Sequence, residues 1–355
     1  MLHVRGVVLP DGEERDLYVA GGRLTYEPVR GAETVAGGGW VLPGLVDVHC
    51  HVGISPDGAV ADEATLVAQA HTDRDAGALL IRDCGAPVDT RPLAERPDLP
   101  RIVRAGQHLA RPKRYLRDIG VEVEPEELPA AAEQQARYGG GWVKLVGDWI
   151  DRDVGDLAPL WPADALAAAV ARAHAAGARV AVHVFGAEAL PDLLAAGVDS
   201  IEHGTGLSDA LLGVMARQGT ALVPTLINVD NFPRIADGAA KYPAYAERMR
   251  RLHGTARQRL RAAYEAGIPI YAGSDAGGGV EHGRVAEEIR ALHAAGLPAG
   301  VALAAGSWAA RSWLGLPGLV EGAPADLTVY PADPRTDLGV LARPSRIVLR
   351  GRVVR

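Results

Sequence analysis

The chain has 355 residues, of which 48% are hydrophobic and 23% are charged. This is ordinary globular composition, so it excludes a disordered chain and allows one large domain with a sizeable core. The net charge is −7 and the 37 basic residues are spread among 44 acidic ones, which leaves no basic stripe for a nucleic-acid backbone.

The N-terminal segment and the cysteines bear on the compartment. The segment MLHVRGVVLPDGEERD has neither a basic stretch followed by an apolar one nor a small-residue cleavage site, so we expect no secretion. No apolar run approaches the roughly 18 residues that a membrane helix needs. The two cysteines, Cys50 and Cys84, cannot build a disulfide framework and fit a reducing cytoplasm. We therefore expect a cytoplasmic protein, with homo-oligomerisation left open.

The predicted elements change in character near residue 41. Before it, LHVRGVVL and RDLYVAGGRLTY are short alternating segments bounded by DG and GG turns, which is typical of paired strands. After it, eight short runs rich in Val, Ile and Leu alternate with longer stretches of helical period. The predicted strands are 41–49, 78–84, 101–106, 141–147, 178–185, 198–204, 220–226 and 268–275. Predicted helices include 163–177, 188–197 and 244–267, each closed by a Gly suited to a C-cap.

Eight strands with helices between them predict a (β/α)8 TIM-like barrel, here over residues 43–317. The tail segments ADLTVYP and RIVLRGRVVR have the same strand character as the N-terminal segments. We therefore expect residues 1–42 and 318–355 to pair into a small β-sandwich subdomain built from both termini.

The first predicted barrel strand ends in a pair of histidines, His49 and His51. The period of two along a strand turns both rings to the same face, which suits one metal ion. Such a pair also occurs in strands and turns without a metal. Asp47, two residues earlier, could orient a ligand imidazole or be a simple buried strand carboxylate.

Three further side chains end other predicted strands: His183 on the fifth, His203 on the sixth and Asp275 on the eighth. Active sites of such barrels lie at the carboxyl ends of the strands, so five metal-capable groups meet on one face. Neutral imidazoles and carboxylates are ligands for a divalent ion such as zinc, and a site with an open position activates water. Their joint arrangement predicts a metal site.

Lys144 lies in the apolar fourth strand, WVKLV. An ammonium group that points into a barrel is costly unless it is paired or chemically altered. One interpretation is a salt bridge to a neighbour such as Asp148. The other is a modified lysine that serves as a ligand.

These residues carry a family resemblance. The segment VLPGLVDVHCH resembles the opening strand of the amidohydrolase superfamily, and Lys144, His183, His203 and the GSDAG segment with Asp275 accompany it. The run VHVFGAEALPDLLAAGVDSIEHGT (182–205) closely resembles prolidase-like and imidazolonepropionase-like members. The terminal segments, including GAPADLTVY, match as well, so the resemblance covers essentially the whole chain.

In binuclear members of that superfamily the strand-four lysine is carboxylated by CO2 and bridges two metals. The resemblance implies that His49, His51 and Asp275 bind one divalent ion, and that His183 and His203 bind another. Carboxylated Lys144 and a hydroxide would lie between the two ions. Zinc is expected, although manganese, iron and cobalt suit the same ligands.

The implied reaction is hydrolysis of a C–N bond in an amide, a dipeptide, an N-acyl amino acid or a cyclic amide. Hydroxide would attack, Asp275 would carry the proton to the leaving nitrogen, and the metal on the His203 side would polarise the carbonyl. One alternative is a mononuclear deaminase or imidazolone-type ring hydrolase, which would not need Lys144 as a ligand. Another is a catalytically inactive scaffold relative, although all six candidate ligands are present.

Five residues in strand-end loops are candidates for substrate contact. His108, Arg114 and Tyr115 share the loop after strand three and could bind a carboxylate or a carbonyl. Asn228 follows VPTL in strand seven, where prolidase-like members often carry a Tyr. That departure argues against dipeptide specificity. His282 lies in the Gly-rich loop after strand eight, as a similar histidine does in prolidase-like relatives.

Overall fold

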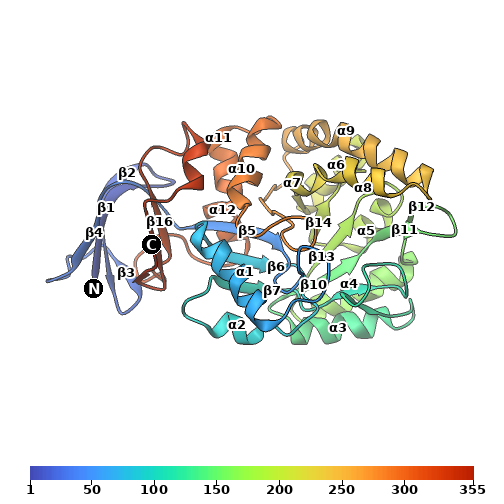
Figure 1. The fold of residues 1–355 in the computed structure, drawn as a ribbon, viewed down its shortest axis with the longest axis horizontal. Helices are drawn as coiled ribbons and strands as arrows, with labels where there is room; N and C mark the ends of the chain where they lie inside the picture. Colours follow the sequence, from blue (N-terminus) through green and yellow to red (C-terminus); the bar gives the residue numbers. More distant parts are fainter.

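The computed structural model describes residues 1–355 and contains a barrel of parallel strands surrounded by helices, with a separate sheet at one end (Figure 1). Seven barrel strands occur in the predicted order: β5 (Leu45–Cys50), β6 (Ala78–Asp83), β7 (Arg101–Arg104), β10 (Trp142–Val146), β13 (Arg179–Val184), β14 (Ser200–His203) and β15 (Ala221–Val223). Their side chains are almost all buried, as expected for parallel strands covered on both faces. The (β/α)8 architecture predicted from the sequence is confirmed.

The eighth barrel position is taken by residues 268–276, which have no regular strand assignment. Backbone hydrogen bonds nevertheless join this segment to both neighbours. On one side Tyr271 N donates to Leu222 O, and on the other Val48 N donates to Ala272 O and Asp275 N donates to His49 O. The last of these bonds places Asp275 directly beside the histidine pair.

The third strand is bent, which divides the hydrogen-bonded ring. Its first part, β7, pairs with β6, and its second part, β8 (His108–Ala110), pairs with β10. Gly106 lies between them with φ of 72°, a conformation that favours glycine. The chain then adds β9 (Gly120–Glu122) beside β8. After β10 it forms a hairpin of β11 (Asp148–Asp151) and β12 (Asp156–Pro159).

The helices cover the outside of the barrel. Three predicted helices are present as α4 (Ala163–Ala175), α5 (Leu190–Ala196) and α9 (Pro243–Glu265). In α4 the buried residues are Leu166, Ala169, Val170 and Ala173, the spacing of one helix face. The others are α1 (Glu63–Asp75), α2 (Arg91–Glu95), α3 (Leu128–Tyr138), α6 (Asp209–Gln218), α7 (Leu226–Val229), α8 (Phe232–Gly238), α10 (Val285–Ala294), α11 (Ala299–Ala305), α12 (Trp308–Trp313) and the 3-10 helix η1 (Leu338–Ala342).

Strands from both ends of the chain form one seven-stranded sheet, with both termini at that end of the molecule (Figure 1). Its order is β18-β17-β16-β4-β1-β2-β3. The strands are β1 (Leu2–Val8), β2 (Glu13–Ala20), β3 (Arg23–Thr25), β4 (Glu33–Leu42), β16 (Leu327–Tyr330), β17 (Arg346–Leu349) and β18 (Arg352–Val353). The sheet has its own apolar cluster, which includes Val4, Leu17 and Leu327. The division of the chain at residues 42/43 and 317/318 stays a prediction.

None of the helices has the length and apolar character that crossing a membrane requires.

Candidate metal centre

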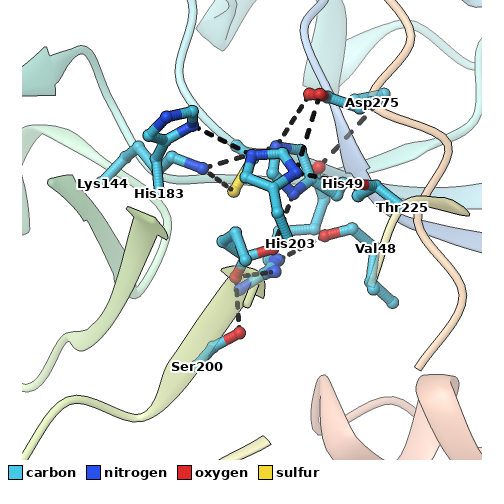
Figure 2. Close-up of polar contacts among 12 residues, drawn as sticks. Val48, His49, Lys144, His183, Ser200, His203, Thr225 and Asp275 are labelled. Atoms are coloured by element: carbon cyan, nitrogen blue, oxygen red, sulfur yellow. Dashed lines mark hydrogen bonds and ion pairs between the residues drawn. The ribbon is translucent and has the colours of Figure 1, made fainter. Parts of the chain in front are cut away.

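The six predicted ligands line one cavity of about 320 Å³ at the carboxyl ends of the barrel strands. They are His49, His51, Lys144, His183, His203 and Asp275. Figure 2 shows five of them by label, with His203 at the centre, Asp275 on one side and Lys144 and His183 on the other. Residues from five different strands are thus brought to one place by the barrel.

His49, His51 and Asp275 present three acceptor atoms to one point. His49 Nε2 lies 3.2 Å from His51 Nε2, and Asp275 Oδ1 lies 3.0 Å from each of these nitrogens. The opposite nitrogen of each ring is already used: His49 Nδ1 donates to Glu202 at 2.6 Å and His51 Nδ1 donates to Gly85 O at 2.9 Å. Since an oxygen partner holds the proton on Nδ1, the Nε2 lone pairs face inward, which is the arrangement of metal-bound histidines.

The surroundings of these rings favour a positive charge between them. Burial alone lowers the pKa of His49, but Cys84, Asp275 and Glu202 raise it to about 9. Burial also lowers the pKa of His51, which keeps that ring neutral. Three acceptors within about 3 Å of one another repel unless a proton or a cation lies among them. The donor set therefore fits a divalent ion.

His183 and His203 form a second pair, with His183 Nδ1 3.0 Å from His203 Nε2. The far nitrogen of His203 lies 2.7 Å from Thr225 Oγ1, whereas His183 Nε2 is buried with no hydrogen-bond partner. Burial lowers the pKa of His203 to about 3 and that of His183 well below its usual value. Both rings are therefore neutral, the form that binds metals.

Three non-glycine residues at the site have a left-handed backbone: His203 with φ of 67°, Asp275 with φ of 58° and Thr225 with φ of 45°. Such conformations are costly and cluster at functional sites, where the surrounding structure maintains them. In a regular strand Glu202 and His203 would point to opposite faces. The positive φ of His203 lets both residues contact the histidine cluster.

Lys144 is buried and forms no ion pair with a carboxylate. Its Nζ lies 3.4 Å from His49 Nε2 and 3.4 Å from Cys84 Sγ. The interpretation of a salt bridge to Asp148 is wrong, because Asp148 accepts from the backbone of Phe185 and Gly186 instead. A buried ammonium without a direct ion-pair partner is unfavourable, so a free charged Lys144 would be costly at this place.

A buried ionic network behind His49 was not predicted from the sequence. Glu202 accepts from His49 with one oxygen, and with the other from Arg82 Nη2 at 2.7 Å and from the Ser200 hydroxyl (Figure 2). Burial opposes the charge of Glu202, but Arg82 and His49 hold its pKa well below the usual range. Asp47 does not orient an imidazole, because its carboxylate accepts from the His49 backbone and from Ser274.

Two of the predicted substrate contacts line the cavity. Tyr115 lies in its wall, and Asn228 donates to Asp275 Oδ2 at 2.6 Å. Asn228 is thus positioned to orient the carboxylate whose other oxygen faces the histidines.

The structure places the other three predicted contacts away from the cavity surface. His108 is fully buried behind His51, with ring centroids 4.9 Å apart. Arg114 is half-buried, pairs with Asp151 at 2.8 Å and donates to the backbone of the β11–β12 hairpin. His282 Nδ1 donates to Asp73 at 2.8 Å beside a separate depression. Arg114 and His282 are therefore committed to partners that lie far away in sequence, and His108 supports a ligand ring.

Most of the remaining cavity wall was not predicted from the sequence. It consists of Ile54, Leu116, Trp149, Phe185, Asn231, Arg234, Ile235, Tyr245 and the glycines 277–279. Several come from α8 and α9 or from the β11–β12 hairpin, which fold over the site only in the tertiary structure.

Comparisons with known proteins identify the family of the chain. The profile of the Amidohydrolase family matches residues 40–354. The protein Rv2915c of Mycobacterium tuberculosis, described as uncharacterized, is 59% identical over 353 residues, which are 99% of this chain and 95% of the relative.

Solved structures share the fold over nearly the whole chain. A Bifidobacterium longum protein assigned as a prolidase is 26% identical, with a TM-score of 0.84, and the match covers 99% of this chain and 93% of that one. A Xaa-Pro dipeptidase with bound methionine is 24% identical, with a TM-score of 0.82 and coverage of 99% and 98%. The resemblance stated from the strand-end motifs is thus confirmed: the chain belongs to the amidohydrolase family.

Proposed function

We propose that this protein is a binuclear metal-dependent hydrolase that cleaves the C–N bond of an amide, in an N-acyl amino acid, a dipeptide or a cyclic amide. Family membership supports a metal-dependent hydrolase in general. The observation that carries the binuclear assignment is the position of Lys144. Its buried Nζ lies beside His49 and has no carboxylate partner.

One ion would be held by His49, His51 and Asp275, and the other by His183 and His203. Carboxylation joins the neutral amine of Lys144 to the carbon of CO2 and releases one proton. The product is a carbamate anion that can bridge two cations and offset their repulsion. When bound, the metals would supply a water of lowered pKa and would polarise the carbonyl of the amide.

Asp275 would carry the proton of the reaction. One oxygen, Oδ1, faces His49 and His51, while Oδ2 is held by Asn228. The carboxylate would accept a proton from the attacking water and pass it to the leaving nitrogen, because an amine leaves only when it is protonated. The aromatic wall of Tyr115, Trp149 and Phe185 would exclude water from the reacting groups.

A Lys144→Ala variant tests this proposal. Metal analysis of the purified protein should find close to two divalent ions per chain, and the variant should lose at least one of them together with hydrolysis. Exchange of the exposed Lys241 for Ala is the matched control and should leave both unchanged. Full metal content and full turnover in Lys144→Ala would remove Lys144 as a ligand, and a single ion per chain in the wild type would favour the mononuclear alternative.

The reaction class is tested separately by supplying Zn²⁺ or Mn²⁺ and screening a library of N-acyl amino acids, dipeptides and cyclic amides. We expect release of a free amine. If no amide is cleaved while a ring amine is converted to a carbonyl, the deaminase alternative holds. If nothing is converted by the metal-loaded protein, the inactive-scaffold alternative holds.

A further inference from the structure

Outside the candidate metal ligands, the cavity wall has one charged side chain without an ion-pair partner, the guanidinium of Arg234. This side chain is exposed and forms no ion pair. Neighbouring arginines differ, because Arg250 pairs with Asp237 and Arg257 pairs with Asp230. A guanidinium that faces a cavity without a protein partner is available to a carboxylate of a ligand, which it can bind with two hydrogen bonds.

Arg234 continues a row of polar side chains that leads outward from the metal centre. Asn228 contacts Asp275, and Asn231 and Arg234 follow at intervals of three residues along α7 and α8. Both outer side chains lie beside the glycine loop after the eighth strand. A Cβ on Gly279 would be 3.5 Å from Arg234 Nη2 and 3.8 Å from Asn231 Nδ2. This side of the cavity is therefore built from hydrogen-bond donors.

Another part of the cavity wall is aromatic and uncharged. Tyr115 and Trp149 have ring centroids 4.8 Å apart, and Trp149 and Phe185 lie 6.5 Å apart. All three rings pack around His183, at centroid distances of 4.4 to 6.1 Å. An apolar group beside this cluster would be desolvated on binding, and an ionised group there would find no partner.

The acidic groups of the cavity limit the substrate further. Asp275 is the sole carboxylate among the lining residues, and its oxygens are committed to the histidines and Asn228. The free ammonium group of a dipeptide would therefore have no counter-charge in the cavity, whereas a neutral acyl group would need none.

We propose that the substrate is an N-acyl amino acid whose carboxylate binds Arg234 and whose apolar acyl group packs against Tyr115, Trp149 and Phe185. This inference rests on the proposed C–N hydrolysis and names its substrate class. The cavity volume of about 320 Å³ lies at the small end of ligand pockets, which suits a molecule of this size.

Three compounds that differ by one charged group each test the selectivity of the metal-loaded enzyme. They are 3-phenylpropanoyl-L-leucine, its leucinamide analogue without the carboxylate, and the dipeptide L-phenylalanyl-L-leucine, which adds an ammonium group. We expect kcat/KM for the N-acyl acid to exceed that for each of the others by at least about 10-fold. Equal or faster cleavage of either the leucinamide or the dipeptide would overturn the proposal.

An Arg234→Gln variant tests the assigned residue. We expect its kcat/KM for the N-acyl acid to fall by about 10- to 100-fold, mainly through KM, with the leucinamide unchanged within about 2-fold. Arg234→Lys should restore part of the loss, because it keeps the charge but not the planar pair of donors. Arg250→Gln is the control, since Arg250 pairs with Asp237 and does not line the cavity. Equal losses for acid and leucinamide would refute a carboxylate contact.

Binding separates failure of this inference from failure of the proposed reaction. If the metal-loaded wild type cleaves none of the three compounds and no amide of the wider library, the C–N hydrolase proposal fails. Calorimetry then still measures the affinity for the N-acyl acid. The wild type should bind this compound at least about 10-fold more tightly than Arg234→Gln does. Equal affinities would overturn the assignment of Arg234.

Discussion

The far nitrogens of the candidate ligand histidines decide which ring atoms face the centre. Glu202 fixes His49, Gly85 O fixes His51 and Thr225 fixes His203. Each of these partners holds Nδ1 and leaves Nε2 directed toward the other ligands. Such supporting contacts commonly change metal affinity by 10- to 100-fold when they are removed, so they belong to the site as much as the ligands do.

At this scale the sequence predicted the residues that meet in the cavity but not the side chains that support them. His49, His51, His183, His203 and Asp275 were found because strand ends of a barrel share one face. Glu202 precedes His203, and strand alternation would separate the two side chains. They act together because His203 adopts a positive φ, which no pattern in the sequence shows.

The residues of the loops were harder to predict for a similar reason. Arg114 and His282 occur in polar or Gly-rich loops after strands, where contact with a substrate was a reasonable hypothesis. Their partners, Asp151 and Asp73, come from other elements. Arg234 differs from these two residues, because it forms no ion pair within the protein and lines the cavity.

Replacing Asp275 with Asn tests the proton transfer. Asn keeps an oxygen that can face His49 and His51 but cannot carry the proton. We therefore expect kcat to fall by at least about 10²-fold, with substrate binding retained. Steady-state kinetics together with metal analysis would measure this. Asp237→Asn, on the exposed end of α8, is the control, and near-normal turnover in Asp275→Asn would remove Asp275 as the proton carrier.

Among the elements, the eight strands were predicted because apolar runs and helical stretches alternate clearly. The bend in the third strand was not, since it depends on Gly106 and on pairing with two different neighbours. The β11–β12 hairpin was also missed. Its turn lies among polar residues that resemble an ordinary loop, yet it contributes Trp149 to the cavity.

The eighth segment approaches β5 so closely that only a glycine fits at position 273. A Cβ there would lie 2.5 Å from His49 Cβ and 2.7 Å from Val223 Cγ1. Gly273→Ala should therefore push the segment that holds Asp275 away from His49, with lower metal content and a lower free energy of unfolding. Overpacking of a buried site typically costs about 1–3 kcal/mol.

The matched control for that change is Gly254→Ala in the middle of α9, where an added Cβ meets nothing within 4 Å. It should stabilise the protein by about 0.5–1 kcal/mol, because Ala is the better helix former. Urea unfolding would measure the free energy of unfolding of both variants, and metal analysis would measure their metal content. Normal metal content in Gly273→Ala would show that the two backbones can separate without disturbing the ligands.

The short helix α7 contains Asn228, and the backbone N–H groups at its N-terminus donate to a buried carboxylate of another helix. Glu288 of α10 accepts from Leu226 N and from Ile227 N, each at 2.9 Å. Burial raises the pKa of Glu288 from 4.5 to about 8, although the two backbone donors oppose this. The folded protein thus holds a proton on Glu288 that the unfolded chain releases above about pH 4.5.

This difference predicts how the free energy of unfolding changes with pH. The contribution of Glu288 to stability should be complete below pH 4.5 and should be lost as the pH rises toward 8, by roughly 1.4 kcal/mol per pH unit. Glu288→Gln resembles the protonated form, so its free energy of unfolding should increasingly exceed that of the wild type between pH 5 and 8. Urea unfolding at several pH values would measure the gap.

Glu287→Gln serves as the control on the same helix, because Glu287 pairs with Arg284 at the surface and its pKa is lowered. The free energy of unfolding of Glu287→Gln should not increasingly exceed that of the wild type as the pH rises from 5 to 8. A constant gap between Glu288→Gln and the wild type would mean that Glu288 is ionised in the folded protein.

At the scale of the whole molecule, one buried carboxylate joins the seven-stranded sheet to the barrel. Asp326 precedes β16 and accepts from Arg101 of β7 and from the backbone of Arg350 at 2.8 Å, with Arg311 Nη1 of α12 at 3.8 Å. Arg311 is buried, and burial lowers its pKa to about 10. The pairing of the two chain ends followed from their shared strand character, but this junction has no local signal in the sequence.

We expect Asp326→Asn to leave Arg311 buried without a counter-charge and to destabilise sheet and barrel together by about 3–5 kcal/mol. Calorimetry should then show a single unfolding transition at a lower temperature. Asp333→Asn is the control, since Asp333 pairs with Arg335 near the surface and should contribute less than about 1 kcal/mol. If a small transition separated from an unchanged main one, Asp326 would stabilise only the sheet, and the barrel with its candidate metal ligands would not depend on it.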